Sequence, residues 1–264
     1  SRENRGLVAS LNQLLAEARA PLVARMDADD VCPPHRFAMQ MEFLSAHPDY
    51  GMVGADCSCI DAAGQPIAGR HIPRPLSHEA IVANLESGPT MLHNVVIYRR
   101  NLVRGLGGYR PAFVHAEDYD LWLRMSRVTR MENLPDPLVA YRLYPEQVSN
   151  RHCITQARSA AQAWLSHQAC LAGQPDPAEG LTVLPADADL DAVFGPGARA
   201  IVHRRAVERS LYAPGALAAE GWAMLLEHAH VDEGSFMRWE LEPTDDGCIL
   251  RLSHFVLDVP GAIE

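Results

Sequence analysis

The sequence predicts an α/β fold for the first part of the chain and a mainly helical C-terminal region. Apolar residues at helical spacing lead directly into a short apolar run at residues 21–26. That run ends in the acidic loop Asp27, Asp29 and Asp30, and in α/β sheets the ligand-binding loops follow the carboxyl ends of strands. From about residue 155 onward, small and apolar residues recur at helical spacing.

The first two elements are a helix over residues 7–18 and a strand over residues 21–26. In a parallel sheet, a strand that is entered from a helix follows an earlier strand. No apolar run of that kind precedes residue 7 in this sequence. We therefore expect the chain to begin in the middle of an α/β domain, with an earlier part missing.

The acidic loop allows two interpretations. Three carboxylates within four residues repel one another unless a cation or a set of donors offsets their charge. Mg²⁺ and Mn²⁺ take oxygen ligands of this kind and bridge them to a diphosphate. The alternative is a solvated acidic turn in which Asp30 or a neighbour caps the next helix. The loop by itself does not decide between them.

The helix after the loop begins at the prolines of residues 33–34, since proline suits the first helical turn. Its buried face is predicted to carry Phe37, Met41 and Leu44. Arg36 and Gln40 lie i,i+4 along one side of the same helix. We therefore expect the apolar side chains to pack on the sheet.

The chain then reads as two short strands at residues 51–55 and 57–60, followed by a turn at residues 61–64. A helix begins near Ser77 and ends at residues 88–89. The apolar run at residues 90–98 is predicted to be a strand that contains His93. A histidine on an apolar strand is usually a satisfied core residue.

A second acidic feature, Glu117, Asp118 and Asp120, runs into the apolar helix at residues 121–125. Its simplest interpretation is a helix N-terminus that is capped by Asp118 or a neighbour. Two acidic clusters about ninety residues apart, each at the boundary of an element, are more suggestive of function than either is alone. A strand at residues 138–143 follows.

The C-terminal region predicts helices at residues 155–171, 198–212 and 217–228. Residues 249–257 suit a strand or a helix equally well. The alternating Asp187, Asp189 and Asp191 follow no apolar strand, so we interpret them as a solvated loop or a helix start.

Composition excludes several classes of protein. The 264 residues are 48% hydrophobic and 21% charged, as in an ordinary globular protein. The net charge of −10 and the absence of a Lys/Arg cluster argue against a nucleic-acid-binding surface. The six cysteines form no C-x-x-C pair, so we expect reduced thiols in a cytoplasmic protein. No apolar run approaches the ~20 residues that span a bilayer, so any membrane association would be peripheral.

The order of several short motifs resembles the inverting family 2 glycosyltransferases of GT-A fold. The resemblance covers about residues 1–150, and its pieces are D-A-D-D at 27–30, P-P-H-R-F-A-M-Q at 33–40, V-G-A at 53–55, D-A-A-G at 61–64, Y-R-R at 98–100, G-G-Y-R at 107–110, E-D-Y-D-L-W-L-R at 117–124 and Y-R at 141–142. It implies a Rossmann-like mixed sheet flanked by helices. It also implies a nucleotide-sugar donor and a divalent metal, Mn²⁺ or Mg²⁺.

Carried onto this sequence, the resemblance assigns Asp27 and Asp29 to the D-x-D pair, with Asp29 as the more direct metal ligand. It assigns Asp118 as the general base, with Glu117 holding the acceptor or supporting Asp118. Inverting transfer needs one carboxylate to take the acceptor's proton, and a carboxylate in a dry pocket has a raised pKa. As further wall residues we expect, on the donor side, Arg36 and His93 and, on the acceptor side, Trp122 and Arg142.

The resemblance divides the chain into a partial catalytic domain, residues 1–152, and a mainly helical region of unknown role, residues 153–264. The family's first βαβ unit, which takes about 30 or more residues, has no counterpart here. The predicted function is therefore transfer of a sugar from a nucleotide-diphosphate sugar to a saccharide or lipid-linked acceptor, in the synthesis of a cell-surface polysaccharide or glycolipid. The alternatives are a non-catalytic remnant or interaction module and, well behind, a nucleotidyltransferase or phosphohydrolase, because no glycine-rich phosphate loop is present.

Overall fold

The computed structural model describes residues 4–69, 74–144, 147, 151–210, 235–244 and 247–257, with backbone alone for residue 210 and the last two ranges. Its centre is a four-stranded sheet in the order β1-β3-β2-β4. The strands are β1 (Leu22–Ala24), β2 (Tyr50–Ile60), β3 (Ile97–Arg99) and β4 (Arg130–Arg142). Pairing is parallel between β2 and β4, and antiparallel where β3 meets β1 and β2. The predicted mixed α/β sheet is confirmed.

This pairing pattern decides which loops meet. Because β3 is antiparallel to both of its neighbours, β1, β2 and β4 all run in one direction, and their carboxyl ends lie at the same edge. The amino end of β3 lies at that edge too. The acidic loop after β1 is thus brought beside the segment that precedes β3 and the residues that follow β2 and β4.

Both faces of the sheet are covered, because successive side chains of a strand point to opposite faces. Met52 of β2 packs into the larger core cluster, which includes Trp122. The next residue, Val53, packs on the other side with Leu44. The helices of this part are α1 (Leu7–Glu17), α2 (Arg36–Ala46), α3 (His78–Asn84), α4 (Arg100–Gly105) and α5 (Glu117–Met125).

The expected buried face of α2 is wrong. Leu44 is buried, but Phe37 and Met41 are 44% and 52% exposed, whereas Arg36 and Gln40 are fully buried. Polar side chains face inward here because backbone carbonyls need donors. Gln40 donates to the carbonyl oxygens of Val95 and Val53 at 2.7 and 3.3 Å, and its own amide oxygen accepts a hydrogen bond from Arg36 Nε.

Two strand predictions also change. Residues 51–55 and 57–60 belong to the single strand β2, whose register against β4 shifts near Asp56. The run at residues 90–98 is not one strand, because a 3₁₀ turn at η2 (His93–Val95) precedes the short β3. A second 3₁₀ turn, η1 (Leu85–Ser87), follows α3. The turn at η2 directs His93 and Asn94 toward the loop edge of the sheet.

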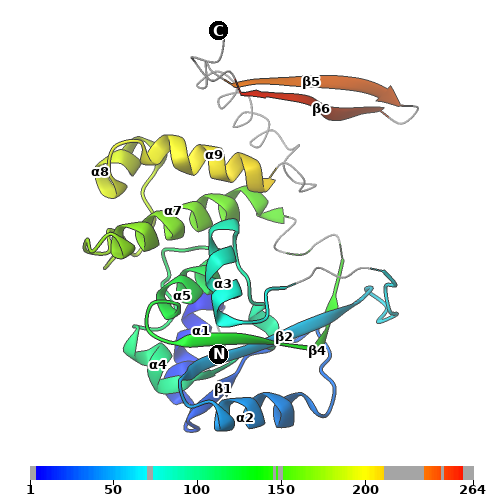
Figure 1. Cartoon of the computed structure of the whole chain (residues 1–264), viewed down its shortest axis with the longest axis vertical. Coiled ribbons are helices and arrows are strands. Elements are labelled where there is room, and N and C mark those ends of the chain that lie inside the picture. Colours follow the sequence, from blue (N-terminus) through cyan, green and yellow to red (C-terminus); the bar gives the residue numbers. More distant parts are fainter. Residues whose placement is uncertain are drawn as a thin grey trace.

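The C-terminal region contains helices as far as Ser210, joined by turns and irregular segments. It comprises α7 (Cys153–Leu171), the 3₁₀ turn η3 (Asp187–Asp189), α8 (Leu190–Phe194) and α9 (Ala198–Ser210) (Figure 1). Further on, β5 (Ser235–Thr244) and β6 (Gly247–Leu257) pair as an antiparallel hairpin, so residues 249–257 are a strand. The helix predicted at residues 217–228 lies outside the described residues. None of the described helices is long and apolar enough to cross a membrane.

Candidate functional site

The acidic loop brings its three carboxylates together at the edge where β1, β2 and β4 end. One oxygen each of Asp27, Asp29 and Asp30 lies within 4.8 Å of the others. Asp27 is half-buried, Asp29 exposed and Asp30 buried. Two oxygen ligands on opposite sides of one cation, each about 2.1 to 2.4 Å from it, are separated by a similar distance. The spacing of these carboxylates therefore fits a hard divalent cation.

Asp30 differs from the other two carboxylates because both of its oxygens accept hydrogen bonds from the protein. Its Oδ1 accepts the Arg142 backbone N–H at 2.8 Å, and its Oδ2 accepts the Asn94 amide at 2.5 Å. Burial raises its pKa, and these two hydrogen bonds act in the opposite direction. Asp30 thus anchors the loop to η2 and β4, whereas Asp29 accepts one hydrogen bond from the Tyr144 hydroxyl at 3.0 Å.

Arg142, an expected acceptor-side residue, lies against the acidic loop instead. Its guanidinium donates to the carbonyl oxygens of Asp29 and Asp61 at 2.7 and 3.0 Å. Those two residues follow β1 and β2, whose carboxyl ends meet the end of β4 at this edge. Arg142 therefore holds three chain segments together beneath the candidate metal ligands.

A cavity of about 230 Å³ opens beside this loop, and its lining includes both Asp27 and Asp118. We call it the Asp118 cavity. His93 and Tyr141 also line it, together with Arg74, Pro89, Met91, Leu92 and Asn94. Of the predicted site residues, Asp27, His93 and Asp118 share this cavity, while Asp29 lies beside it in the carboxylate cluster. The fold thus joins the two acidic clusters.

Asp118 and its neighbour Glu117 occupy the first turn of α5. Burial raises the pKa of Asp118, while the Tyr119 N–H, which Asp118 Oδ1 accepts at 2.7 Å, and the positive charge of Arg25 lower it. Burial, followed by repulsion from Asp118, raises the pKa of Glu117 to about 7. The pKa values of two such neighbouring carboxyls are coupled, because the charge of one raises the pKa of the other.

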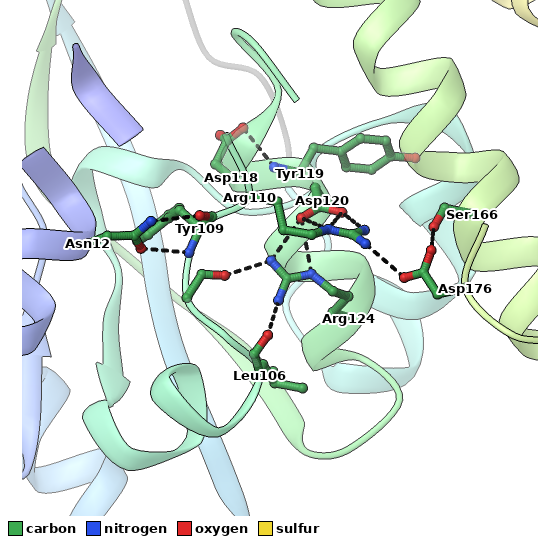
Figure 2. Close-up of polar contacts among 11 residues, drawn as sticks. Asn12, Leu106, Tyr109, Arg110, Asp118, Tyr119, Asp120, Arg124, Ser166 and Asp176 are labelled. Atoms are coloured by element: carbon green, nitrogen blue, oxygen red, sulfur yellow. Dashed lines mark hydrogen bonds and ion pairs between the residues drawn. The ribbon is translucent and has the colours of Figure 1, made fainter. Parts of the chain in front are cut away.

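Asp120 has a different environment on the same helix. It is 1% exposed and accepts hydrogen bonds from the guanidinium groups of both Arg110 and Arg124 (Figure 2). Arg110 also pairs with Asp176 at 2.8 Å, and Asp176 accepts a hydrogen bond from Ser166 on α7. This network links α5 to the C-terminal region and leaves Asp120 without access to the cavity.

His93 and Trp122 lie side by side behind the cavity. Their rings are 5.9 Å apart, and Nε2 of His93 lies 3.0 Å from the Tyr109 hydroxyl. Burial, with a smaller contribution from Arg25, lowers the pKa of His93 well below its usual value. Trp122 is fully buried. His93 is therefore a neutral wall residue of the cavity, and Trp122, expected on the acceptor side, is a core residue that supports it.

Arg25 is the functional candidate that sequence reasoning overlooked. It is 9% exposed, and its Nη1 lies 2.5 Å from Asp27 Oδ2. Its charge lowers the pKa of both Asp118 and Glu117. The available signal was a cation at the end of an apolar strand, two residues before the first loop aspartate.

Arg36, expected on the donor side, acts on the candidate site indirectly, by holding the backbone of Arg25. It is fully buried, and its Nη2 donates to the Arg25 carbonyl oxygen at 2.7 Å. Burial lowers its pKa. Arg36 thus holds the end of β1 from below and does not line the Asp118 cavity.

Comparison with known proteins gives a family match over the part of the chain that carries the acidic loop and His93. Residues 1–107 match the family described as Glycosyl transferase family 2. The chain is 33% identical over 163 residues to the amylovoran biosynthesis glycosyltransferase AmsE of Erwinia amylovora, covering 61% of this chain and 60% of that protein. It is 30% identical over 138 residues to the O-antigen biosynthesis glycosyltransferase WbnJ of Escherichia coli, covering 51% and 52%. The chain thus spans about half to three fifths of these relatives.

Among solved structures, the chain is similar to a mannosyltransferase from Pyrobaculum calidifontis in complex with GDP-Man and Mn²⁺. The TM-score is 0.43 at 21% sequence identity, covering 87% of this chain and 61% of that chain.

Proposed function

We propose that this chain transfers a sugar from a nucleotide-diphosphate sugar to an acceptor hydroxyl with inversion, because residues 1–107 match glycosyl transferase family 2. The observation that carries the proposal is the Asp118 cavity. Asp27, from the candidate metal cluster, and Asp118, the candidate base, line it together. A base and a cluster for the leaving group are the two parts that this reaction needs.

In this mechanism, Asp118 is the general base. Its pKa is raised by burial, so the carboxylate is more basic than an exposed aspartate and accepts the proton of the attacking hydroxyl more readily. Glu117, with a pKa of about 7, is a neighbouring store for that proton. The mechanism assigns the attack to the face of the donor sugar opposite the leaving diphosphate, which inverts the anomeric centre.

We assign Asp29 and Asp27 as the ligands of a divalent cation, Mn²⁺ or Mg²⁺. Asp29 is exposed and Asp27 half-buried, so both carboxylates are accessible to a donor. A cation bound there would stabilise the negative charge of the departing diphosphate. Arg25 holds Asp27 in place, and Arg36 and Arg142 hold the backbone on either side of the loop.

The biological setting follows from the relatives. AmsE and WbnJ are named for amylovoran and O-antigen biosynthesis, so we propose a role in making a cell-surface polysaccharide, with a saccharide or lipid-linked acceptor. We assign the chain to the cytoplasm, peripheral to the membrane. We retain residues 1–152 as the catalytic domain and residues 153–264 as a second region.

The proposal is tested by donor-induced thermal stabilisation. Binding of a ligand to the folded state raises its apparent stability by about 2.7 kcal/mol at a ligand concentration of 100 times Kd. The melting temperature of the chain is measured with UDP-, GDP- and dTDP-sugars, with and without Mn²⁺. We expect one donor to raise it only when Mn²⁺ is present. If no donor changes it, the chain is a non-catalytic member of the family.

A further inference from the structure

A second cavity, of about 330 Å³, continues the Asp118 cavity away from the acidic loop. The two cavities share Arg74 and Pro89 in their linings. Arg209 of α9 lines the far wall of the second cavity, which we call the Arg209 cavity. None of the three loop aspartates lines it. The Asp118 cavity and the second cavity therefore adjoin at these two residues.

The polar groups of the Arg209 cavity have few partners within the protein. The Thr90 hydroxyl is buried without a hydrogen-bond partner, and Thr90 is only 5% exposed. Nε of Arg74 is also buried without a partner. Arg209 lies over the Tyr119 ring at 5.9 Å, and its positive charge lowers the pKa of Asp118. Buried polar groups without partners are rare and often mark a place that a ligand fills.

The sign of the charge in this cavity is clear. Two arginines line it, and in the described part of the chain no carboxylate does. This is notable in a chain whose net charge is −10. Guanidinium groups bind planar and tetrahedral oxyanions with charge-assisted hydrogen bonds.

The backbone leaves space for one of these arginines. Gly88 has a φ of 137°, and a Cβ atom there would lie 2.5 Å from Nη1 of Arg209. Any other residue would therefore meet the guanidinium as well as a strained backbone. The Arg209 head group thus lies directly against the Gly88 backbone, in the cavity wall next to Thr90.

We propose that the Arg209 cavity binds an anionic group, a phosphate or a carboxylate, carried by the saccharide acceptor. The inference rests on the proposed function, since it places the acceptor on the side of Asp118 that is remote from the metal cluster. The donor's diphosphate belongs beside Asp27 and Asp29, which do not line this cavity. The C-terminal region thereby completes the acceptor site through α9.

The test measures binding of glucose 1-phosphate, glucuronic acid and glucose to the whole chain by ligand-observed NMR. We expect one or both anionic sugars to bind more tightly than glucose, and the comparison between them separates phosphate from carboxylate. Arg209→Gln should weaken binding of the anionic sugar about tenfold or more, because it removes a hydrogen bond to a charged group. Arg204→Gln is the matched control, since Arg204 is an exposed arginine on the same helix that does not line the cavity.

Thr90→Val is the second variant. It removes a buried hydroxyl that has no hydrogen-bond partner among the described residues, so the melting temperature should stay unchanged or rise. Binding of the anionic sugar should nevertheless weaken several-fold. Equal binding by the wild type, Arg209→Gln and Thr90→Val would overturn the proposal.

Binding of UDP with Mn²⁺ separates this proposal from the proposed function. We expect Arg209→Gln to bind UDP as tightly as the wild type does. A parallel loss of UDP and glucose 1-phosphate would assign the cavity to the donor and overturn the proposal. Arg209-dependent binding of the sugar phosphate without any binding of UDP would support the anion site and count against the glycosyltransferase function.

Discussion

The Arg25 guanidinium lies 2.5 Å from the Asp27 carboxylate at the end of β1. The same positive charge lowers the pKa of Asp118, which is far away in the sequence and lines the same cavity as Asp27. Arg25 therefore acts on both halves of the candidate site. It orders a proposed metal ligand and moderates the basicity of the proposed base.

Replacement of Arg25 should change the pH dependence of transfer. Arg25→Met removes a charge that lowers the pKa of Asp118 and Glu117, so both pKa values should rise further. Since a general base acts when deprotonated, the acid limb of the kcat/KM profile should move to higher pH. Arg25→Lys keeps the charge and should leave the limb nearly in place. An unmoved limb in Arg25→Met would contradict this role.

Asp118→Asn should abolish transfer while the chain still binds the donor. A positioned general base contributes typically 10²- to 10⁴-fold to the rate, so kcat should fall by about that factor in the full-length protein. Asp136→Asn, an exposed carboxylate outside the cavity, is the control. Turnover within a few-fold of the wild type would show that another group is the base.

Asp29→Ala should weaken Mn²⁺-dependent donor binding. Asp29 is the exposed member of the carboxylate cluster, and its Oδ2 has the Tyr144 hydroxyl as partner. Removal of one of two protein ligands should lower the metal affinity about tenfold or more, measured by titrating Mn²⁺ into the donor complex. Asp136→Ala serves as the control for charge loss alone. If the Mn²⁺ requirement is unchanged, the cation lies elsewhere.

Glu117 should make stability depend on pH in an unusual direction. Its pKa is about 7 in the folded protein, against 4.5 for the free side chain. Between these values the folded state binds more protons than the unfolded state, so the free energy of unfolding falls as pH rises from about 4.5 to about 7. Glu117→Gln should therefore stabilise the protein at pH 8 by about 1 to 3 kcal/mol in denaturant unfolding, with little effect at pH 4. If the difference in free energy of unfolding between Glu117→Gln and the wild type did not change with pH over this range, the raised pKa would be contradicted.

The inverted face of α2 gives a stability prediction. Gln40→Met removes the donor to two buried carbonyls and the acceptor of Arg36 Nε, so it should cost about 2 to 4 kcal/mol. Met41→Gln, one residue along and 52% exposed, should change the free energy of unfolding by less than about 0.5 kcal/mol. Chemical denaturation of the two variants checks this. If both substitutions lowered the free energy of unfolding by similar amounts, the inward orientation of Gln40 would be contradicted.

Much of the fold could be predicted from the sequence because local patterns are strong in α1, α7 and the acidic loop. The carboxylates Asp27, Asp29 and Asp118 could be selected because their residue type and order suggest chemistry. Gln40 could not be predicted as buried, since its burial depends on carbonyls of Val53 and Val95 that other segments supply. Arg25 was overlooked because, apart from Asp27, the carboxylates whose pKa values it lowers belong to α5.

The sequence by itself determined the α/β class, the helical stretch after residue 153 and the two acidic clusters, because periodicity and residue type are local properties. Only the tertiary structure decided that Asp27 and Asp118 share a cavity, that Trp122 is a core residue and that Arg142 supports the acidic loop. It also brought Arg209 of α9 beside the same cavity system. These outcomes depend on strand order and on the antiparallel β3, which decide which loops meet at one edge of the sheet.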